Sequence, residues 1–348
     1  MKLASICRTK EIRGYEIPGI IHNGDYYLID LQVFADGLIN CWQMVDLPMF
    51  REKLRRGWVV TSIPEPAALS IHDIGSVSVT SPVWAHTTNG LLKHIQAVVR
   101  ELNPRMENLY DCHGRDTELV NSVRYAAVNS DNPRPWKTNG PISPLVQGMF
   151  GGALRHFQVR DRSLHLVKIQ LFEDDSARIF GGAEVQSLDF ASLTKRLADP
   201  DCSRLPDVGD RVVIEGLVNF TAGEWTYRVD PDQLFAEIQD LHDQVHGRPG
   251  KIRECLAAFR DYLAKQSTET LEKLRQKYEA VPAHLRAYCG DMDVKDVPIK
   301  LILYGKDQIE SWSHYQVAKQ CGEELPSIDI PEPPSVNSSS ISDETNSC

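Results

Sequence analysis

The chain has 348 residues, of which 42% are hydrophobic and 25% are charged, as expected for a folded protein of two or three domains. The net charge is −10, but residues 323–348 contain six acids and no Lys or Arg, which leaves only −4 for the rest. This nearly neutral body disfavours a general nucleic-acid-binding protein, which would normally show a basic face.

The chain shows no pattern for export or for membrane insertion. Charged residues interrupt any apolar run near the N-terminus, and no apolar stretch approaches the roughly 18 residues that span a bilayer. Eight cysteines are scattered without a C-x-x-C pair, which favours cytosolic thiols over a disulfide framework or a zinc site. We therefore expect a cytoplasmic protein without a membrane segment.

The first 102 residues predict a β-rich unit that ends in a helix. Pro48 suits the first position of a short helix, and Asn89 can cap a longer helix with apolar residues on one face. The expected elements, in chain order, are strands 27–34 and 38–44, helix 48–56, strands 58–61 and 69–79, and helix 90–102.

A similar pattern returns between residues 161 and 247, which indicates an internal duplication. The offset between matching residues grows from 138 to 141 and then 143, as loop insertions between conserved elements would produce. The matches are Gln32, Val33 and Phe34 with Gln170, Leu171 and Phe172; Asp36 with Asp174; Trp42 with Phe180; Gly75 with Gly216; Trp84 with Trp225; and Leu91, Leu92 and Ile95 with Leu234, Phe235 and Ile238.

The expected fold class is α+β: two related small β-rich α+β domains, then an α-rich C-terminal module and a disordered acidic tail. Apolar periodicity predicts helices from 251 and from 268, and alternation of Ile299, Leu301 and Leu303 predicts one strand over 297–304. A helical piece is expected over 116–127. The predicted divisions are 1–102, a long connector 103–160, 161–247, 248–322, and the tail 323–348.

Two stretches resemble uncharacterised bacterial proteins built from domains of unknown function. One is 280–305, which contains His284, Tyr288 and Asp291, and the other is 26–66, which contains Cys41 next to Trp42. The resemblance implies a bacterial cytosolic protein. It implies no activity and brings no catalytic residues.

A basic patch on the short helix is the candidate nucleic-acid surface. Basic residues beside aromatic rings can bind phosphates and stack bases, although a solvated helix face is the commoner meaning of such a pattern. The candidate binding residues are Arg51, Lys53, Arg55 and Arg56, with Trp42 and Trp58 nearby in sequence.

A cluster of aspartates is the candidate metal site. Asp291, Asp293 and Asp296 lie close together with His284 upstream, and a D-x-D turn can offer oxygen ligands to Mg²⁺ or Ca²⁺. The alternative is a turn in which Asp caps neighbouring backbone N–H groups, which is commoner. The closing Glu of a calcium loop is missing.

Two further motifs are weaker. His242 and His246 have the i,i+4 spacing of a zinc-binding helix, but Asp243 replaces the usual Glu and no third ligand follows. Cys112 and His113 are adjacent in a long loop, where a thiol and an imidazole seldom face each other. Glycine-rich phosphate loops are missing.

The leading hypothesis from sequence is a non-catalytic intracellular interaction protein with a protein partner and no cofactor. An accessory or immunity-type role in bacterial antiviral defence fits the resemblance. The alternatives are a metal-assisted hydrolase that uses Asp291, Asp293 and Asp296, and nucleic-acid binding through the basic patch. Duplicated modules can offer two similar surfaces or one composite groove. The sequence leaves the oligomeric state open.

Overall fold

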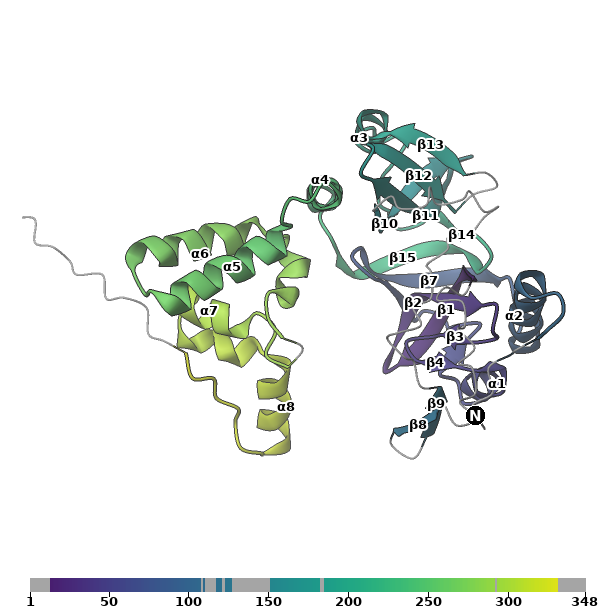
Figure 1. The fold of residues 1–348 in the computed structure, drawn as a ribbon, viewed down its shortest axis with the longest axis horizontal. Coiled ribbons are helices and arrows are strands. Elements are labelled where there is room, and N and C mark those ends of the chain that lie inside the picture. The colour runs from purple at the N-terminus through teal and green to yellow at the C-terminus, as the bar shows by residue number, and fades with distance from the viewer. Residues whose placement is uncertain are drawn as a thin grey trace, which may run out of the picture. The chain divides into compact units, whose positions relative to one another are not determined.

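The computed structural model describes residues 13–107, 109, 117–120, 123–126, 151–181, 185–291 and 293–330. The chain divides into two compact units, Met1–Ile238 and Gln239–Cys348. The first unit holds a large mixed sheet with helices, and the second unit is helical (Figure 1). The α+β fold class predicted from the sequence is confirmed.

The first copy of the duplicated domain ends with a long helix. Its elements are β1 (Gly14–Asn23), β2 (Asp25–Phe34), β3 (Ile39–Asn40), β4 (Met44–Val45), α1 (Leu47–Arg55), β5 (Val59–Val60), β6 (Ala68–Ile71), β7 (Gly75–Trp84) and α2 (Thr88–Leu102). Helix α1 begins after Asp46, whose carboxylate accepts a hydrogen bond from the Met49 N–H at 2.8 Å. Helix α2 is capped by Thr87 and not by Asn89, because the Thr87 hydroxyl accepts from the Gly90 N–H.

The second copy repeats this order and begins earlier than the sequence suggested. Its elements are β10 (Gly151–Arg160), β11 (Ser163–Phe172), β12 (Ser176–Phe180), β13 (Gln186–Asp189), α3 (Phe190–Leu197), β14 (Arg211–Ile214), β15 (Val218–Arg228) and α4 (Pro231–Val245). Strand β10 pairs with β11 over ten residues, as β1 pairs with β2. Residues 151–160, assigned to the connector from sequence, therefore belong to the second copy.

One insertion explains the change in offset between the copies. Gly14 faces Phe34 and Gly151 faces Phe172, so the hairpin ends are 138 positions apart at the phenylalanines. From β4 and β13 onward every paired element is 143 positions apart. Three residues separate the paired Asn40 and Met44, whereas eight separate Arg178 and Ser187, so the five extra residues lie between Arg178 and Ser187. The sequence matches of Gly75 with Gly216 and of Trp84 with Trp225 were therefore wrong by two positions, because the ladders align Gly75 with Val218.

Strands β7 and β15 pair with each other and join the two copies into one sheet of 13 strands (Figure 1). Gly75 pairs with Arg228, and Trp84 pairs with Val218, so the last strands of the two copies run antiparallel to each other. A Cβ at Gly75 would lie 2.3 Å from the Tyr227 carbonyl oxygen, and its φ is +144°. Glycine is therefore required at position 75, where β7 pairs with β15.

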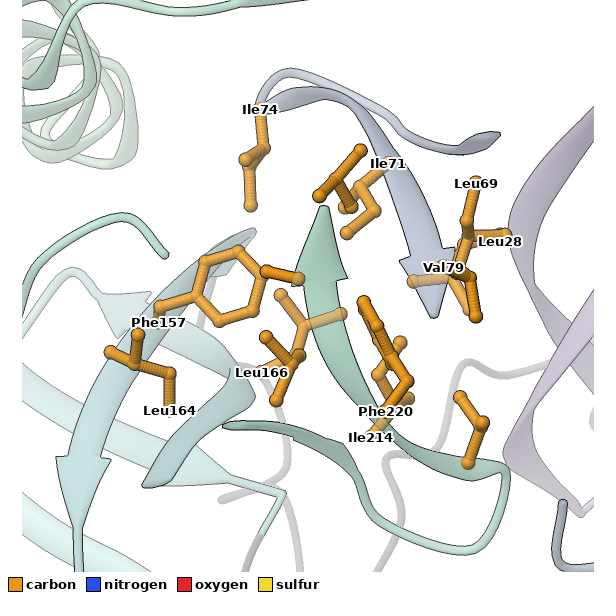
Figure 2. Close-up of a cluster of buried hydrophobic side chains, with 14 of the residues drawn as sticks. Leu28, Leu69, Ile71, Ile74, Val79, Phe157, Leu164, Leu166, Ile214 and Phe220 are labelled. Carbon is orange, nitrogen blue, oxygen red and sulfur yellow. The ribbon is translucent and has the colours of Figure 1, made fainter. Parts of the chain in front are cut away.

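The two copies share a hydrophobic core. Figure 2 shows Leu28, Leu69 and Val79 of the first copy in the same cluster as Phe157 and Leu166 of the second. The opposite face of the β1–β2 hairpin packs its alternate residues against α1 and α2 in a separate core. The inward faces of both hairpins therefore meet, which places their polar ends close together as well.

The second unit is built from helices, including the segment predicted as a strand. Its elements are α5 (Lys251–Ala264), α6 (Thr268–Ala280), the 3-10 helix η1 (Ala283–Tyr288), α7 (Val297–Tyr304), the 3-10 helix η2 (Lys306–Ser311) and α8 (Ser313–Cys321). The strand predicted over 297–304 was wrong. Helix α7 is buried on most sides, so its apolar run carries no helical periodicity, while Pro298 suits its first turn.

The predicted helical piece over 116–127 was also wrong, because Thr117–Val120 (β8) and Val123–Ala126 (β9) pair as an antiparallel hairpin. The five cysteines that the structure describes are free thiols. Among the described residues, no helix combines the length and the hydropathy that crossing a bilayer requires.

Candidate functional site

A pocket of about 260 Å³ lies within the first unit, where the two copies meet. Its lining comes from the two hairpins and from the ends of β12 and β14. The lining residues are Glu16, Pro18, Leu28, Asp30, Arg155, Leu166, Val167, Lys168, Phe180, Gly181, Ile214 and Glu215.

Equivalent positions of the two copies come together in the lining of this pocket. Asp30 is paired with Pro18 in the first hairpin, and Lys168 is paired with Arg155 in the second. Three pairs of equivalent residues line the pocket: Pro18 with Arg155, Leu28 with Leu166, and Asp30 with Lys168. The pocket is therefore a composite of the duplication and does not exist in either copy alone.

Four charged side chains form a connected ionic cluster along one wall. The Lys168 Nζ lies 2.6 Å from Glu16 Oε2 and 3.0 Å from Asp30 Oδ2. The Arg155 guanidinium lies 2.8 Å from the same Asp30 oxygen. Gln32 donates to the other oxygen of Glu16 at 3.1 Å. Each carboxylate of the first copy is thus bound by a cation of the second.

The two carboxyls respond differently to this environment. Burial raises the pKa of the Glu16 carboxyl more than the single cation Lys168 lowers it. Burial acts in the same direction on Asp30, but Arg155 and Lys168 together hold the pKa of Asp30 below its ordinary value. Asp30 is therefore firmly ionised, and Glu16 is the member of the cluster that protonates more readily.

The remaining wall is apolar, with one acid near it. Leu28, Leu166, Phe180 and Ile214 supply the apolar surface. Glu215 is exposed and forms no hydrogen bond or ion pair with any residue that the structure describes. The lining thus carries three carboxylates against two cations, which favours a ligand that bears a positive charge.

The sequence analysis missed this site because its residues are far apart in the chain. A signal was present: Asp30 and Lys168 stand two positions before the matching Gln32 and Gln170, with opposite charges in otherwise apolar strands. Gln32 also has a role beyond the repeat pattern, since it bonds Glu16 and accepts from Asn40 at 3.0 Å.

The family model described as "Domain of unknown function (DUF7638)" matches residues 2–106 and 148–249, which is more than half of the chain. The chain belongs to the DUF7638 family. The two matched segments confirm the predicted duplication, and the pocket lies between two DUF7638 repeats. A second model, "Domain of unknown function (DUF7639)", matches residues 250–327. Comparisons with curated proteins and with solved structures found no match.

The predicted basic patch lies on α1 of the first DUF7638 repeat, and most of its charges have local partners. Arg55 and Arg56 both bond Glu52, and these bonds lower the pKa of Glu52 to about 2. Lys53 donates to Gln43 and lies 4.6 Å from the centre of the Trp58 ring. Arg51 is exposed and has no ion pair among the described residues. Nucleic-acid binding through this patch stays a prediction.

The predicted metal-binding aspartates lie in the second unit, and Asp291 and Asp296 have different hydrogen-bond partners. Asp291 Oδ1 accepts from the backbone N–H groups of Asp293 and Val294 at 3.0 and 2.8 Å, so it caps its own turn. Asp296 is buried, and its carboxylate accepts from the Tyr278 hydroxyl at 2.7 Å and lies 3.4 Å from Lys300. These bonds match the capping alternative, and a metal at Asp291 and Asp293 stays an untested prediction.

The turn is nevertheless tightly built. A Cβ at Gly290 would lie 1.4 Å from the Lys295 carbonyl oxygen, so only glycine allows the chain to close on itself here. His284 lies in η1, upstream of the turn. The DUF7639 match covers this whole region.

The two histidines of α4 lie close together, with their ring planes tilted by 46°. Their ring centroids are 4.4 Å apart, and His246 Nδ1 lies 2.8 Å from the His242 carbonyl oxygen, which makes that nitrogen a donor. Asp243, at the position of a metalloprotease general base, lies 3.1 Å from Arg248. The motif of Cys112 and His113 lies outside the described residues.

Proposed function

We propose that this chain is a non-catalytic binding protein that holds a basic side chain of a protein partner in the pocket between its DUF7638 repeats. The observation that supports this proposal is the lining of the pocket, in which three carboxylates outnumber two cations beside an apolar wall. A Lys or Arg side chain has the matching chemistry, because its aliphatic stem packs on apolar surface while its head binds carboxylates.

The size of the pocket supports a side chain over a larger ligand. Its volume of about 260 Å³ is below the roughly 300–1,000 Å³ of pockets that bury drug-sized molecules. Among the acids, the exposed Glu215 is the one left to bind the charged head, and the other two are poorly placed for catalysis. Glu16 and Asp30 are held by Lys168 and Arg155, whereas a general acid or base needs a lone pair or proton within reach of its substrate.

A titration with a defined probe tests the chemistry. Nα-acetyl-lysine N-methylamide should shift the methyl resonances of Leu28, Leu166 and Ile214 saturably, and the Nε-acetylated analogue should not. Glu215→Gln should weaken binding by about tenfold, since it removes one charge-assisted hydrogen bond. Glu224→Gln, at an exposed acid of β15, is the matched control. Equal methyl shifts with the lysine probe and with the Nε-acetylated analogue would contradict the proposal.

The protein partner is tested with the same variants. The full chain should capture the same protein from a lysate of its source organism as wild type and as Glu224→Gln, but not as Glu215→Gln. Loss of capture in both variants, or in neither, would contradict recognition through the pocket. A cytoplasmic location, which the scattered cysteines favour, is also proposed. We further propose an accessory or immunity-type role in bacterial antiviral defence, for which the sequence resemblance is the only support.

A further inference from the structure

A second polar cluster lies on the other face of the β10–β11 hairpin and has no role in the pocket proposed above. Four side-chain nitrogens here are buried and have no hydrogen-bond partner in the described part of the chain. They are Gln158 Nε2, Arg160 Nε, His165 Nδ1 and Arg196 Nε. Buried polar atoms are nearly always bonded in folded proteins, so a group of unsatisfied ones requires an explanation.

These four residues are neighbours. Gln158 and His165 are directly paired across the hairpin and share one face. The Arg160 Nη2 donates to Gln158 Oε1 at 2.9 Å, which places the fully buried amide beside the guanidinium. Arg196 is in the last turn of α3, where its Nη1 donates to Gln186 Oε1. Burial and then the nearby positive charge of Arg196 lower the pKa of Arg160.

The equivalent positions of the first copy hold no such polar cluster. Its equivalent residues are Ile21, Asn23, Tyr27 and Lys53. Ile21 is fully buried in a hydrophobic core, and Tyr27 packs against the same core. Lys53 lies over the Trp58 ring. The first copy therefore fills the space with hydrophobic contacts. The second copy has amide, imidazole and guanidinium groups with buried nitrogens that have no hydrogen-bond partner in the described part of the chain.

We propose that Gln158, Arg160, His165 and Arg196 form a binding site for a small oxyanion, the phosphate or carboxylate group of a ligand. Guanidinium and amide N–H groups are the donors that such oxygens prefer, and paired arginines hold them at fixed geometry. Glu215 acts electrostatically on both Arg160 and His165, and no ion pair joins it to either in the described part of the chain. The acceptor that these nitrogens lack is then supplied by the anion.

The local charge balance agrees with an anion of low charge. Arg160, Arg196 and Arg211 are the cations near this face, and Asp161 and Glu215 are the acids. One positive charge is left over when the imidazole is neutral, and burial lowers the pKa of His165 toward that neutral form. This inference does not depend on the proposed function of the pocket.

The test is an NMR titration of the full chain with sodium sulfate, sodium phosphate and sodium acetate, each against sodium chloride at equal ionic strength. The Gln158 side-chain amide and the Arg160 Nε–H resonances are the direct reporters. Saturable shifts with any of the three oxyanions, beyond those with chloride, are expected, and comparison of phosphate with acetate identifies which oxyanion fits better.

Variants decide whether the site is the one proposed. Arg160→Gln and Arg196→Gln should each weaken oxyanion binding by about tenfold, while Lys93→Gln, at an exposed lysine of α2, should change nothing. Glu215→Gln keeps the donors intact and should strengthen binding, which is opposite to its expected effect on the lysine probe. Shifts equal to those of chloride, or equal affinity in Arg160→Gln and Lys93→Gln, would overturn the inference.

Discussion

Lys168→Met should destabilise the first unit by roughly 3 kcal/mol at pH 7, because it leaves a buried carboxylate without its cation. Lys168 Nζ is 2.6 Å from Glu16 and 3.0 Å from Asp30, and the Glu16 side chain is only 3% exposed. Breaking a buried ion pair typically costs about 3–5 kcal/mol. The lower end applies because Asp30 keeps Arg155 at 2.8 Å.

The cost should depend on pH with a definite sign. Burial already raises the pKa of the Glu16 carboxyl above its ordinary value, and loss of Lys168 raises it further. Between the ordinary pKa and the raised one, the folded variant holds a proton that the unfolded chain has released. Stability of the variant therefore falls as pH rises through this window. The destabilisation should be smaller at pH 5 than at pH 7.5 by about 1 kcal/mol or more.

The assay is urea unfolding of the full chain at both pH values. A chain of two compact units need not unfold in a single transition. Hydrogen exchange of peptides from β1, β2, β10 and β11 therefore assigns the transition to the first unit. The double variant Glu16→Gln with Lys168→Met is the control and should regain at least half of the lost stability. A loss below about 1 kcal/mol that does not change with pH would refute the reasoning, since solvated surface ion pairs behave that way.

Three other changes test the packing. Phe50→Ala removes a fully buried ring of α1 and should cost about 3–5 kcal/mol in urea unfolding; a cost below about 1 kcal/mol contradicts this core. Tyr278→Phe removes a donor from the buried Asp296 and should cost about 1–3 kcal/mol in thermal unfolding of the second unit; an unchanged transition argues against the bond. Burial raises the pKa of the Cys41 thiol to about 11, so iodoacetamide at pH 8 should modify exposed Cys321 first; peptide mass spectrometry showing equal rates contradicts its burial.

The sequence predicted the parts of the fold that depend on local pattern. The helix ending at Leu102 was clear because Leu91, Ile95 and Val98 recur at helical spacing, and all three are buried. The prediction of a strand over 297–304 failed, because this short helix is buried on most sides and its apolar residues show no helical periodicity. The pairing of β7 with β15 brings together strands more than 130 residues apart, and no local pattern encodes that contact.

The candidate sites also differ in whether their residues are close together or far apart in the sequence. The aspartate turn and the basic patch were visible because their residues are close in sequence, yet the structure gives most of them local partners. The ionic cluster and the unsatisfied nitrogens depend on the register of two hairpins and on the difference between two copies. Comparing equivalent positions, such as Ile21 with Gln158, is therefore especially informative for a duplicated chain, once the offsets of 137, 138 and 143 are known.

The same comparison predicts that the two copies are not interchangeable. Lys168→Asp gives the second copy the residue that the first copy has at the equivalent position, and it places a third carboxylate beside Glu16 and Asp30. Like charges at this distance are unfavourable, so Lys168→Asp should be less stable than Lys168→Met by at least about 1 kcal/mol at pH 7. The difference should disappear near pH 4, where the added carboxyl can protonate. Equal stability of the two variants at pH 7 in urea unfolding would mean that residue 168 faces solvent, and that the pairing of Asp30 with Lys168 does not hold the repeats together.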